Sequence, residues 1–189
     1  MKNILLIFVL LLVMAAPLVR PTVLSGRERE DPVVVRYDKF KDVTIVETAP
    51  NRVKVLWAKA PESGFRFGYV CPGQDSACHP NVILVTYSTV SPLGVGWELM
   101  NAPRSIIFLA DEKRIAAHDV EWDGLAGPED ITEWFTGAFS PEEFHQLVNA
   151  SEIEYQVGSF HRKVNQKWLS AWRALEAKAY NQGDLQRDK

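Results

Sequence analysis

The stretch Ser140-Pro-Glu-Glu-Phe-His-Gln-Leu-Val-Asn-Ala-Ser-Glu-Ile-Glu-Tyr-Gln-Val157 joins a helix start to an alternating strand. Ser140 is a good helix N-cap, Pro141 suits the first helical position, and Glu143 completes a capping box. These signals predict a short helix near residues 141–149. The second half of the stretch alternates apolar with polar residues, which is typical of a strand with one buried face.

A second helix is expected close to the C-terminus. Asn165 is a suitable N-cap, and an apolar stripe with helical period runs from Trp168 to Ala179. The stripe predicts an amphipathic helix near residues 165–180 that packs on a sheet. A ligand or partner surface is the alternative role for this stripe, and we prefer packing because buried aromatic side chains usually belong to the core.

Upstream of both helices, short runs rich in β-branched and aromatic residues recur between turn-forming residues. This pattern is typical of an antiparallel β-meander. The apolar run Ser105–Leu109 does not alternate, so we expect a central strand that is covered on both faces. The expected strands are Val33–Tyr37, Val43–Glu47, Arg52–Ala58, Phe65–Val70, Val82–Tyr87, Ser105–Leu109, Arg114–Glu121, Ile131–Thr136 and Ile153–Val157, with a short piece near Trp97–Leu99.

These elements predict one α+β domain. We expect a curved antiparallel β-meander sheet or half-barrel of about eight or nine strands, with the C-terminal helix on its concave face. Closure into a barrel of the lipocalin type is the alternative. The G-x-W motif of that family is absent, because Gly96 and Trp97 are adjacent and lie in the middle of the chain.

The N-terminus has the composition of an export signal. Residues 1–24 contain 18 apolar residues, and residues 4–19 carry no charge. A spanning helix needs about 20 apolar residues, so residues 1–19 fit a signal peptide, with a retained membrane anchor and a buried cytosolic helix as alternatives. The expected order is then a flexible leader at residues 20–32, a globular domain at residues 33–182 and a polar tail at residues 183–189.

Charge and motifs argue against several functional classes. The chain has 21 Lys and Arg against 24 Asp and Glu, and the two signs are interspersed. Nucleic acid is therefore not an expected partner, because binding to the phosphate backbone needs a basic patch. The sequence also contains neither a G-x-G-x-x-G nor a Walker A loop, and we expect no cofactor.

Cys71 and Cys78 are the two cysteines of the chain, and turn-forming residues separate them. Export to an oxidising compartment favours a disulfide that closes this small loop. Two free thiols are one alternative, and a metal pair with His79 is the other. A structural zinc site takes four ligands, usually in closer spacing, so the disulfide is preferred.

The strongest candidate for chemistry is the segment His118-Asp-Val-Glu-Trp-Asp123. In an extended segment Asp119, Glu121 and Asp123 would project from one face and His118 from the other. Three carboxylates could hold a hard cation or supply an acid/base pair. The solvated face of an edge strand explains the same residues, and we prefer that interpretation.

The four histidines are scattered along the chain at His79, His118, His145 and His161. They form no H-E-x-x-H or similar pair, so we expect no metal centre. Ser159 follows a glycine but lacks the G-x-S-x-G elbow of a nucleophilic serine.

Several segments together resemble small exported bacterial proteins of uncharacterised function. The resemblance covers about residues 35–180 and implies a β-rich body followed by a helix, a strand and a C-terminal helix. Its motifs belong to the hydrophobic framework, so it transfers no catalytic residue. The segments are Tyr37–Thr44, Gly96–Leu99, Ile107–Asp111, Phe144–Ala150 and Ile153–Gly158.

The sequence therefore predicts an exported protein, either periplasmic or secreted, or anchored by its N-terminal segment. We expect a non-catalytic binding or structural module whose partner is an envelope protein or a small apolar ligand, with membrane contact through residues 4–19 if they are not cleaved. The first alternative is a metal-assisted or hydrolytic enzyme that uses His118, Asp119, Glu121 and Asp123. The second is a membrane-tethered subunit of an envelope assembly.

Overall fold

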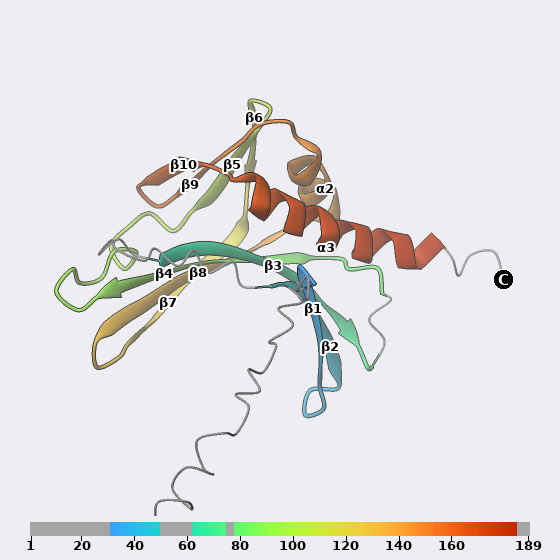
Figure 1. Cartoon of the computed structure of the whole chain (residues 1–189), viewed down its shortest axis with the longest axis horizontal. Helices are drawn as coiled ribbons and strands as arrows, with labels where there is room; N and C mark the ends of the chain where they lie inside the picture. The colour runs from blue at the N-terminus through green and yellow to red at the C-terminus, as the bar shows by residue number, and fades with distance from the viewer. Residues whose placement is uncertain (1–30, 50–61, 75–77, 185–189) are drawn as a thin grey trace, which may run out of the picture. The chain divides into compact units, whose positions relative to one another are not determined.

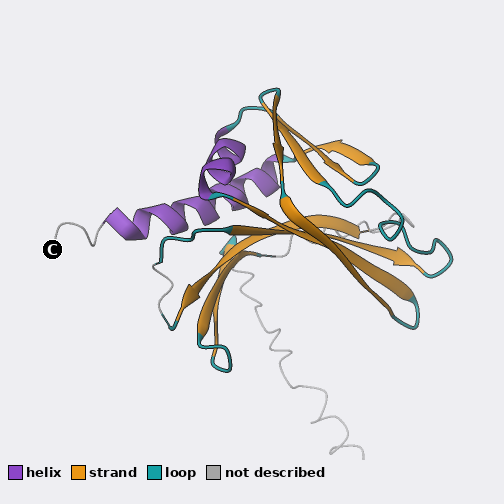
Figure 2. Cartoon of the chain, turned by 180° about the vertical axis from the view of Figure 1, so that it is seen from behind, coloured by secondary structure: helices purple, strands orange, loops and turns teal. Residues whose placement is uncertain are grey.

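Two antiparallel sheets and two helices make up the part of the chain that the computed structural model describes, residues 31–49, 62–74 and 78–184 (Figures 1 and 2). These residues belong to one unit that begins at Asp31. The predicted export segment and strand Arg52–Ala58 lie outside the described residues. Neither described helix is both long and apolar enough to cross a membrane.

The larger sheet has six strands, in the order β1-β2-β3-β4-β8-β7, and every neighbouring pair is antiparallel. Alternation of apolar and polar residues gives it one buried face, and β4 and β8 are the clearest examples. The strands are β1 Val33–Asp38, β2 Val43–Thr48, β3 Glu62–Pro72, β4 Ile83–Pro92, β7 His118–Ala126 and β8 Asp130–Phe139.

The smaller sheet has four antiparallel strands, in the order β10-β9-β5-β6. These are β5 Ile106–Ala110, β6 Lys113–Ala116, β9 Ile153–Val157 and β10 Phe160–Lys163. The predicted α+β class and the antiparallel β-rich body are confirmed, but the strands divide between two sheets. Strand β10 was not predicted, because its four residues lack an alternating apolar pattern.

The predicted single strand Arg114–Glu121 is wrong. The chain leaves the small sheet after β6 and enters the large sheet at β7. Ala117 lies at this crossing, and its backbone N–H still donates to the Ile106 carbonyl oxygen. The run contains Ala116, Ala117 and Asp119, which are poor strand formers, but no glycine or proline marks the point where the chain changes sheets.

Both predicted helices are present. Helix α2 spans Pro141–Asn149 and begins with the full capping box of Ser140 and Glu143. Helix α3 spans Gln166–Asp184, and the Asn165 side chain accepts a hydrogen bond from the Trp168 backbone N–H at 2.8 Å. We expected α3 to end near Tyr180, but its backbone stays helical to Asp184. Gly183 does not end the helix, because one glycine in a helix costs only about 1 kcal/mol.

The core is an aromatic cluster that joins both sheets to α3. Phe65 and Phe67 of β3, Phe108 of β5 and Trp172 of α3 are each at most 2% exposed. Ring centroids are 4.7 Å apart for Phe67 and Trp172, and 5.2 Å apart for Phe65 and Phe108. Side chains from the two sheets and from α3 therefore fill one common interior.

Strand β5 is central in its sheet, as predicted, but only one of its faces is fully covered. Ile106 and Phe108 are buried, whereas Ile107 is half-buried and Leu109 is 39% exposed. The core lies on one side of the small sheet, so the apolar residues on the other side remain open. The expectation of two covered faces is wrong for this reason.

A buried carboxylate fixes the loop before β5. Glu133 of β8 is 0% exposed. It accepts hydrogen bonds from the backbone N–H groups of Glu98, Leu99 and Met100, at 2.5, 3.0 and 2.8 Å, and from the Trp122 indole at 3.2 Å. The predicted short strand at Trp97–Leu99 is wrong, because these N–H groups point at one carboxylate instead of a neighbouring strand.

We predict that Glu133→Gln lowers the free energy of unfolding by about 2–3 kcal/mol, because a charged acceptor is lost and the amide NH₂ faces backbone donors. Urea denaturation measures the change. Glu129→Gln, an exposed residue in the preceding turn, is the control and should change stability by less than about 0.5 kcal/mol. Equal stability of both variants would contradict a structural role for the Glu133 charge.

Candidate binding groove between two helices

A recess in the described part of the chain lies between α2 and α3. Its volume is about 630 Å³, and it opens to solvent. The two helices contact each other, and residues from both form the walls. The lining residues are Glu142, His145, Gln146, Asn149, Glu176, Ala177 and Tyr180.

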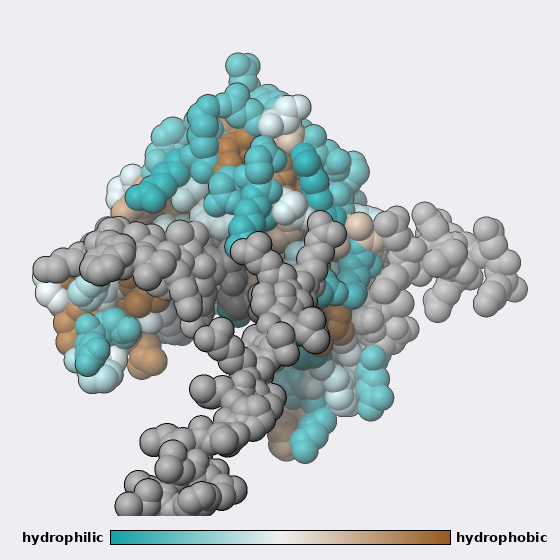
Figure 3. Space-filling model, in the orientation of Figure 1, coloured by the Kyte–Doolittle hydropathy of each residue, from teal (hydrophilic) through white to brown (hydrophobic). Residues whose placement is uncertain are grey.

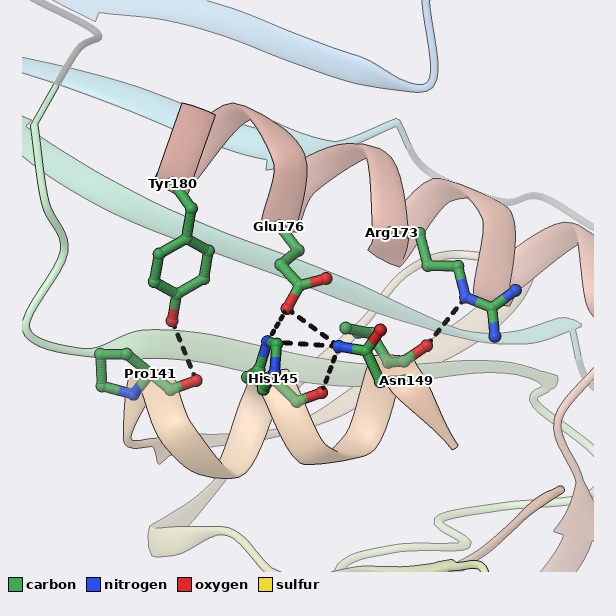
Figure 4. A network of polar contacts seen from close by, with 7 residues as sticks. Pro141, His145, Asn149, Arg173, Glu176 and Tyr180 are labelled. Atoms are coloured by element: carbon green, nitrogen blue, oxygen red, sulfur yellow. Dashed lines mark hydrogen bonds and ion pairs between the residues drawn. The ribbon is translucent and has the colours of Figure 1, made fainter. Parts of the chain in front are cut away.

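A hydrogen-bonded network crosses the groove in its middle (Figure 4). His145 Nδ1 lies 2.5 Å from Glu176 Oε1. Asn149, one helical turn after His145, donates from Nδ2 to the same Glu176 oxygen at 3.3 Å and to the His145 carbonyl oxygen at 2.9 Å. A carboxylate only accepts hydrogen bonds, so the contact places a proton on Nδ1 of the imidazole.

Two further contacts fix the ends of the groove. The Tyr180 hydroxyl donates to the Pro141 carbonyl oxygen at 3.0 Å. At the other end, Arg173 Nε donates a hydrogen bond to the Val148 carbonyl oxygen at 2.8 Å. Arg173 Nη2 donates to the Ala150 carbonyl oxygen at 3.3 Å. Arg173 satisfies carbonyl groups at the C-terminal end of α2, which have no donor within the helix, so the spacing of the helices is set by hydrogen bonds as well as by packing.

The groove has an acidic character. Glu142 and Glu176 are its two carboxylates, and its lining residues include no lysine or arginine, although Arg173 lies at one end and Lys113 Nζ donates to Gln146 Oε1 of the lining at 2.6 Å. Burial raises the pKa of Tyr180, and the charges of Glu176 and Glu142 raise it further. The negative potential of both carboxylates therefore reaches the aromatic wall, which favours a ligand with a positive charge.

A second recess of about 210 Å³ lies on the outer face of the small sheet. Ile107 and Leu109 contribute apolar surface, and Arg114, Glu154 and His161 contribute charged or polar groups. His161 Nε2 lies 2.9 Å from Glu154 Oε2, so two of the polar groups already pair with each other. This recess is smaller than most sites for organic ligands.

The predicted cluster on β7 does not have the expected alternation. His118 is paired with Ala138 and Glu121 with Thr136, so an extra residue lies between them as a β-bulge. Asp119 lies in this bulge with φ of 51°. The insertion places His118 on the same side of the sheet as Glu121 and Asp123 and takes Asp119 out of the row.

His118 is instead a partner of helix α2. Its Nε2 lies 3.0 and 3.1 Å from the two carboxylate oxygens of Glu143, which also completes the capping box. Burial acts to raise the pKa of Glu143, but hydrogen bonds from the Ser140 backbone and from His118 outweigh it, and the pKa lies below its ordinary value.

Asp123 accepts a hydrogen bond from the Gly124 backbone N–H at 2.7 Å. Among the described residues, no three His, Cys, Asp or Glu side chains gather in a way that could hold a metal ion.

Cys71 and Cys78 form a disulfide, as the sequence predicted. Cys71 is the last inward-facing residue of β3 and is fully buried, whereas Cys78 is half-buried. The bond closes the turn between β3 and β4. His79 is exposed beside this turn.

Sequence reasoning missed the groove because it treated His145 as an isolated residue on a polar helix face. The signal that could have shown the groove is a pair of polar stripes of helical spacing. His145 and Asn149 are four residues apart on one helix, and Arg173, Glu176 and Tyr180 follow a similar spacing on the other. Two such stripes become a site only when the helices face each other.

We predict that the double variant Cys71→Ala/Cys78→Ala loses about 2.5 kcal/mol of stability, the chain-entropy value for so short a loop. Thermal unfolding with and without a reductant measures it. Wild type should lose stability in the reductant and the double variant should not. A reductant effect of the same size on both proteins would contradict the assignment.

We predict that Asp119→Ala destabilises the fold by about 1 kcal/mol, because alanine tolerates a positive φ less well than aspartate, whereas Asp119→Gly is neutral or stabilising. Glu121→Ala, at a regular position of the same strand, is the control and should change stability by less than about 0.5 kcal/mol. Urea denaturation measures all three. A loss that is the same for alanine and glycine at position 119 would show that the carboxylate matters more than the backbone.

No family model matches the chain, and comparison with curated proteins and with solved structures finds no match. The residues of the groove and their geometry are therefore the basis for assigning a function.

Proposed function

We propose that this protein is an exported cell-envelope module that binds a ligand in the groove between α2 and α3 and does not catalyse a reaction. The groove itself carries the proposal. Its volume of about 630 Å³ lies within the range of about 300–1,000 Å³ that is usual for ligand sites. Its lining combines Tyr180 and Ala177 with polar side chains. Hydrogen bonds hold three of these polar side chains in place, namely His145, Asn149 and Glu176.

Two observations support export. The apolar residues 4–19 follow Lys2 and precede Arg20, which is the order of a secretory signal or an N-terminal anchor. The disulfide between Cys71 and Cys78 is stable in an oxidising compartment and rare in the cytosol. N-terminal sequencing of the protein from fractionated cells tests this part of the proposal. A cytosolic protein that still begins at Met1 would overturn it.

The hydrogen bonds of the groove favour binding over catalysis. His145, Asn149 and Glu176 contact one another, and the Tyr180 hydroxyl donates to a backbone carbonyl. These groups hold the two helices in place, so a fixed shape is presented without a side chain poised to attack. Such a preformed site lowers the ordering cost of binding.

The ligand that fits the groove best carries an ammonium group next to an apolar body. Glu142 and Glu176 attract the positive charge, and the faces of aromatic rings such as Tyr180 attract cations. Ala177 and the aromatic ring provide apolar contact for the rest of the molecule. An envelope partner could present the same chemistry through a lysine side chain.

Titration of the isotope-labelled protein, as isolated from cells, with three matched probes tests the site. Benzylammonium should shift the backbone NMR signals of the groove residues at lower concentration than benzyl alcohol does, and benzoate should shift them least. Glu142→Gln should weaken the binding of benzylammonium about twofold to fivefold, because one exposed charge is lost.

Ala177→Trp is the blocking variant, because an indole at this position fills the groove. Ser170→Trp is the matched control, since Ser170 is a small exposed residue of α3 that does not line the groove. We expect binding to be lost in the first variant and kept in the second. Signals that shift at β7 instead of the groove, or binding that survives Ala177→Trp, would overturn the proposed site.

A further inference from the structure

The turn between β1 and β2 exposes an aromatic side chain between two lysines. Phe40 is 89% exposed, the largest value among the large apolar residues of the described chain. Lys39 and Lys41 flank it, and Lys39 Nζ lies 5.1 Å from the centre of the Phe40 ring. Figure 1 shows that the β1–β2 turn projects from the large sheet, and Figure 3 shows hydrophobic and hydrophilic residues together at this lower end of the view.

The exposure of Phe40 is fixed by a well-ordered turn. Asp38 Oδ1 accepts hydrogen bonds from the backbone N–H groups of Phe40 at 3.0 Å and Lys41 at 3.4 Å. Asp42 has a positive φ of 51° and accepts a hydrogen bond from the Tyr37 hydroxyl at 2.7 Å. These bonds fix the backbone of the turn, and Phe40 lies within it.

The turn holds its own negative charges close to the backbone. The carboxylates of Asp38 and Asp42 accept the hydrogen bonds that shape it, whereas neither Lys39 nor Lys41 takes part in an ion pair among the described residues. Lysine side chains are long and flexible, so their ammonium groups reach farther out than the short aspartates. An approaching surface therefore meets two positive charges and an aromatic ring first.

The size of this turn favours a bilayer over a protein as the partner. A specific protein interface buries about 800 Å² on each side, and an aromatic side chain supplies about 150–250 Å². One protruding ring can instead enter the headgroup region of a membrane, where flanking lysines contact anionic lipids. We propose that the Lys39-Phe40-Lys41 turn docks on the anionic surface of a lipid bilayer.

This contact is independent of the groove between α2 and α3 and adds to any contact that residues 4–19 make. A single weak membrane signal gives reversible binding, and two signals together give stable attachment. The turn then acts as the second signal and holds the domain close to the membrane surface.

Photo-crosslinking from the turn in the full chain tests the proposal, because the readout is local and every variant shares the same N-terminus. p-Benzoylphenylalanine replaces Phe40 in one protein and Leu125 in the control. Leu125 is 65% exposed on β7 at the end next to the β7–β8 turn, and its neighbours in the sequence of this hairpin include the acidic residues Asp123, Glu129 and Asp130. Both proteins are irradiated with vesicles of phosphatidylcholine and phosphatidylglycerol at about 7:3, and lipid adducts are identified by mass spectrometry.

We expect lipid adducts at position 40 and about tenfold fewer at position 125. Lys39→Gln/Lys41→Gln should reduce the yield at position 40 about 25-fold, as should vesicles without phosphatidylglycerol, because each of the two lysines contributes about fivefold to binding. Equal labelling of both positions, or a yield that does not depend on the lysines, would overturn the proposal. An adduct in cells between position 40 and a protein, in place of lipid, would show that the turn binds a protein partner.

Discussion

Burial of one aromatic cluster holds the two sheets and the C-terminal helix together. Trp172 of α3 lies against Phe67 of β3 and Phe108 of β5, so a single indole contacts both sheets. Its buried Nε1 has no hydrogen-bond partner in the described part of the chain, which shows that packing outweighs the cost of one unpaired donor. The position of α3, and with it the groove beside α2, follows from this contact.

The groove depends on that core through a short chain of contacts. The inward face of α3 is fixed by Trp168, Trp172 and Leu175, which are all buried. The adjacent face then presents Arg173, Glu176 and Tyr180 to α2, where each makes a hydrogen bond. The hydrogen bonds between the two helices fix the side chains of the groove, which is the arrangement on which the proposed binding function depends.

Much of the fold was predictable from local patterns. The capping box at Ser140 and the apolar stripe from Trp168 to Ala179 predicted both helices, because helix signals are short in range. The alternating strands that lie within the described residues were also found. The break at Ala117, the bulge at Asp119 and the loop held by Glu133 were not, because each arises from a partner that is distant in sequence.

The candidate site shows the same limit. The residues singled out for chemistry lay together in sequence, from His118 to Asp123, and a one-residue bulge changed which of them share a face. The groove is formed by two sets of residues, one from each helix, that are more than 25 positions apart in the sequence; His145 and Glu176 are an example. Sequence spacing within one element indicates which side chains share its face, but it contains no information on which other face lies opposite.

The sequence by itself determined the fold class, the two C-terminal helices and the cysteine pair, since each depends on neighbours a few residues away. Tertiary structure alone decided the division into two sheets, the contact of His118 with Glu143 and the groove between α2 and α3. The physical reason is that burial of the aromatic core selects one arrangement of elements, and polar groups then find the partners that this arrangement brings within hydrogen-bonding distance.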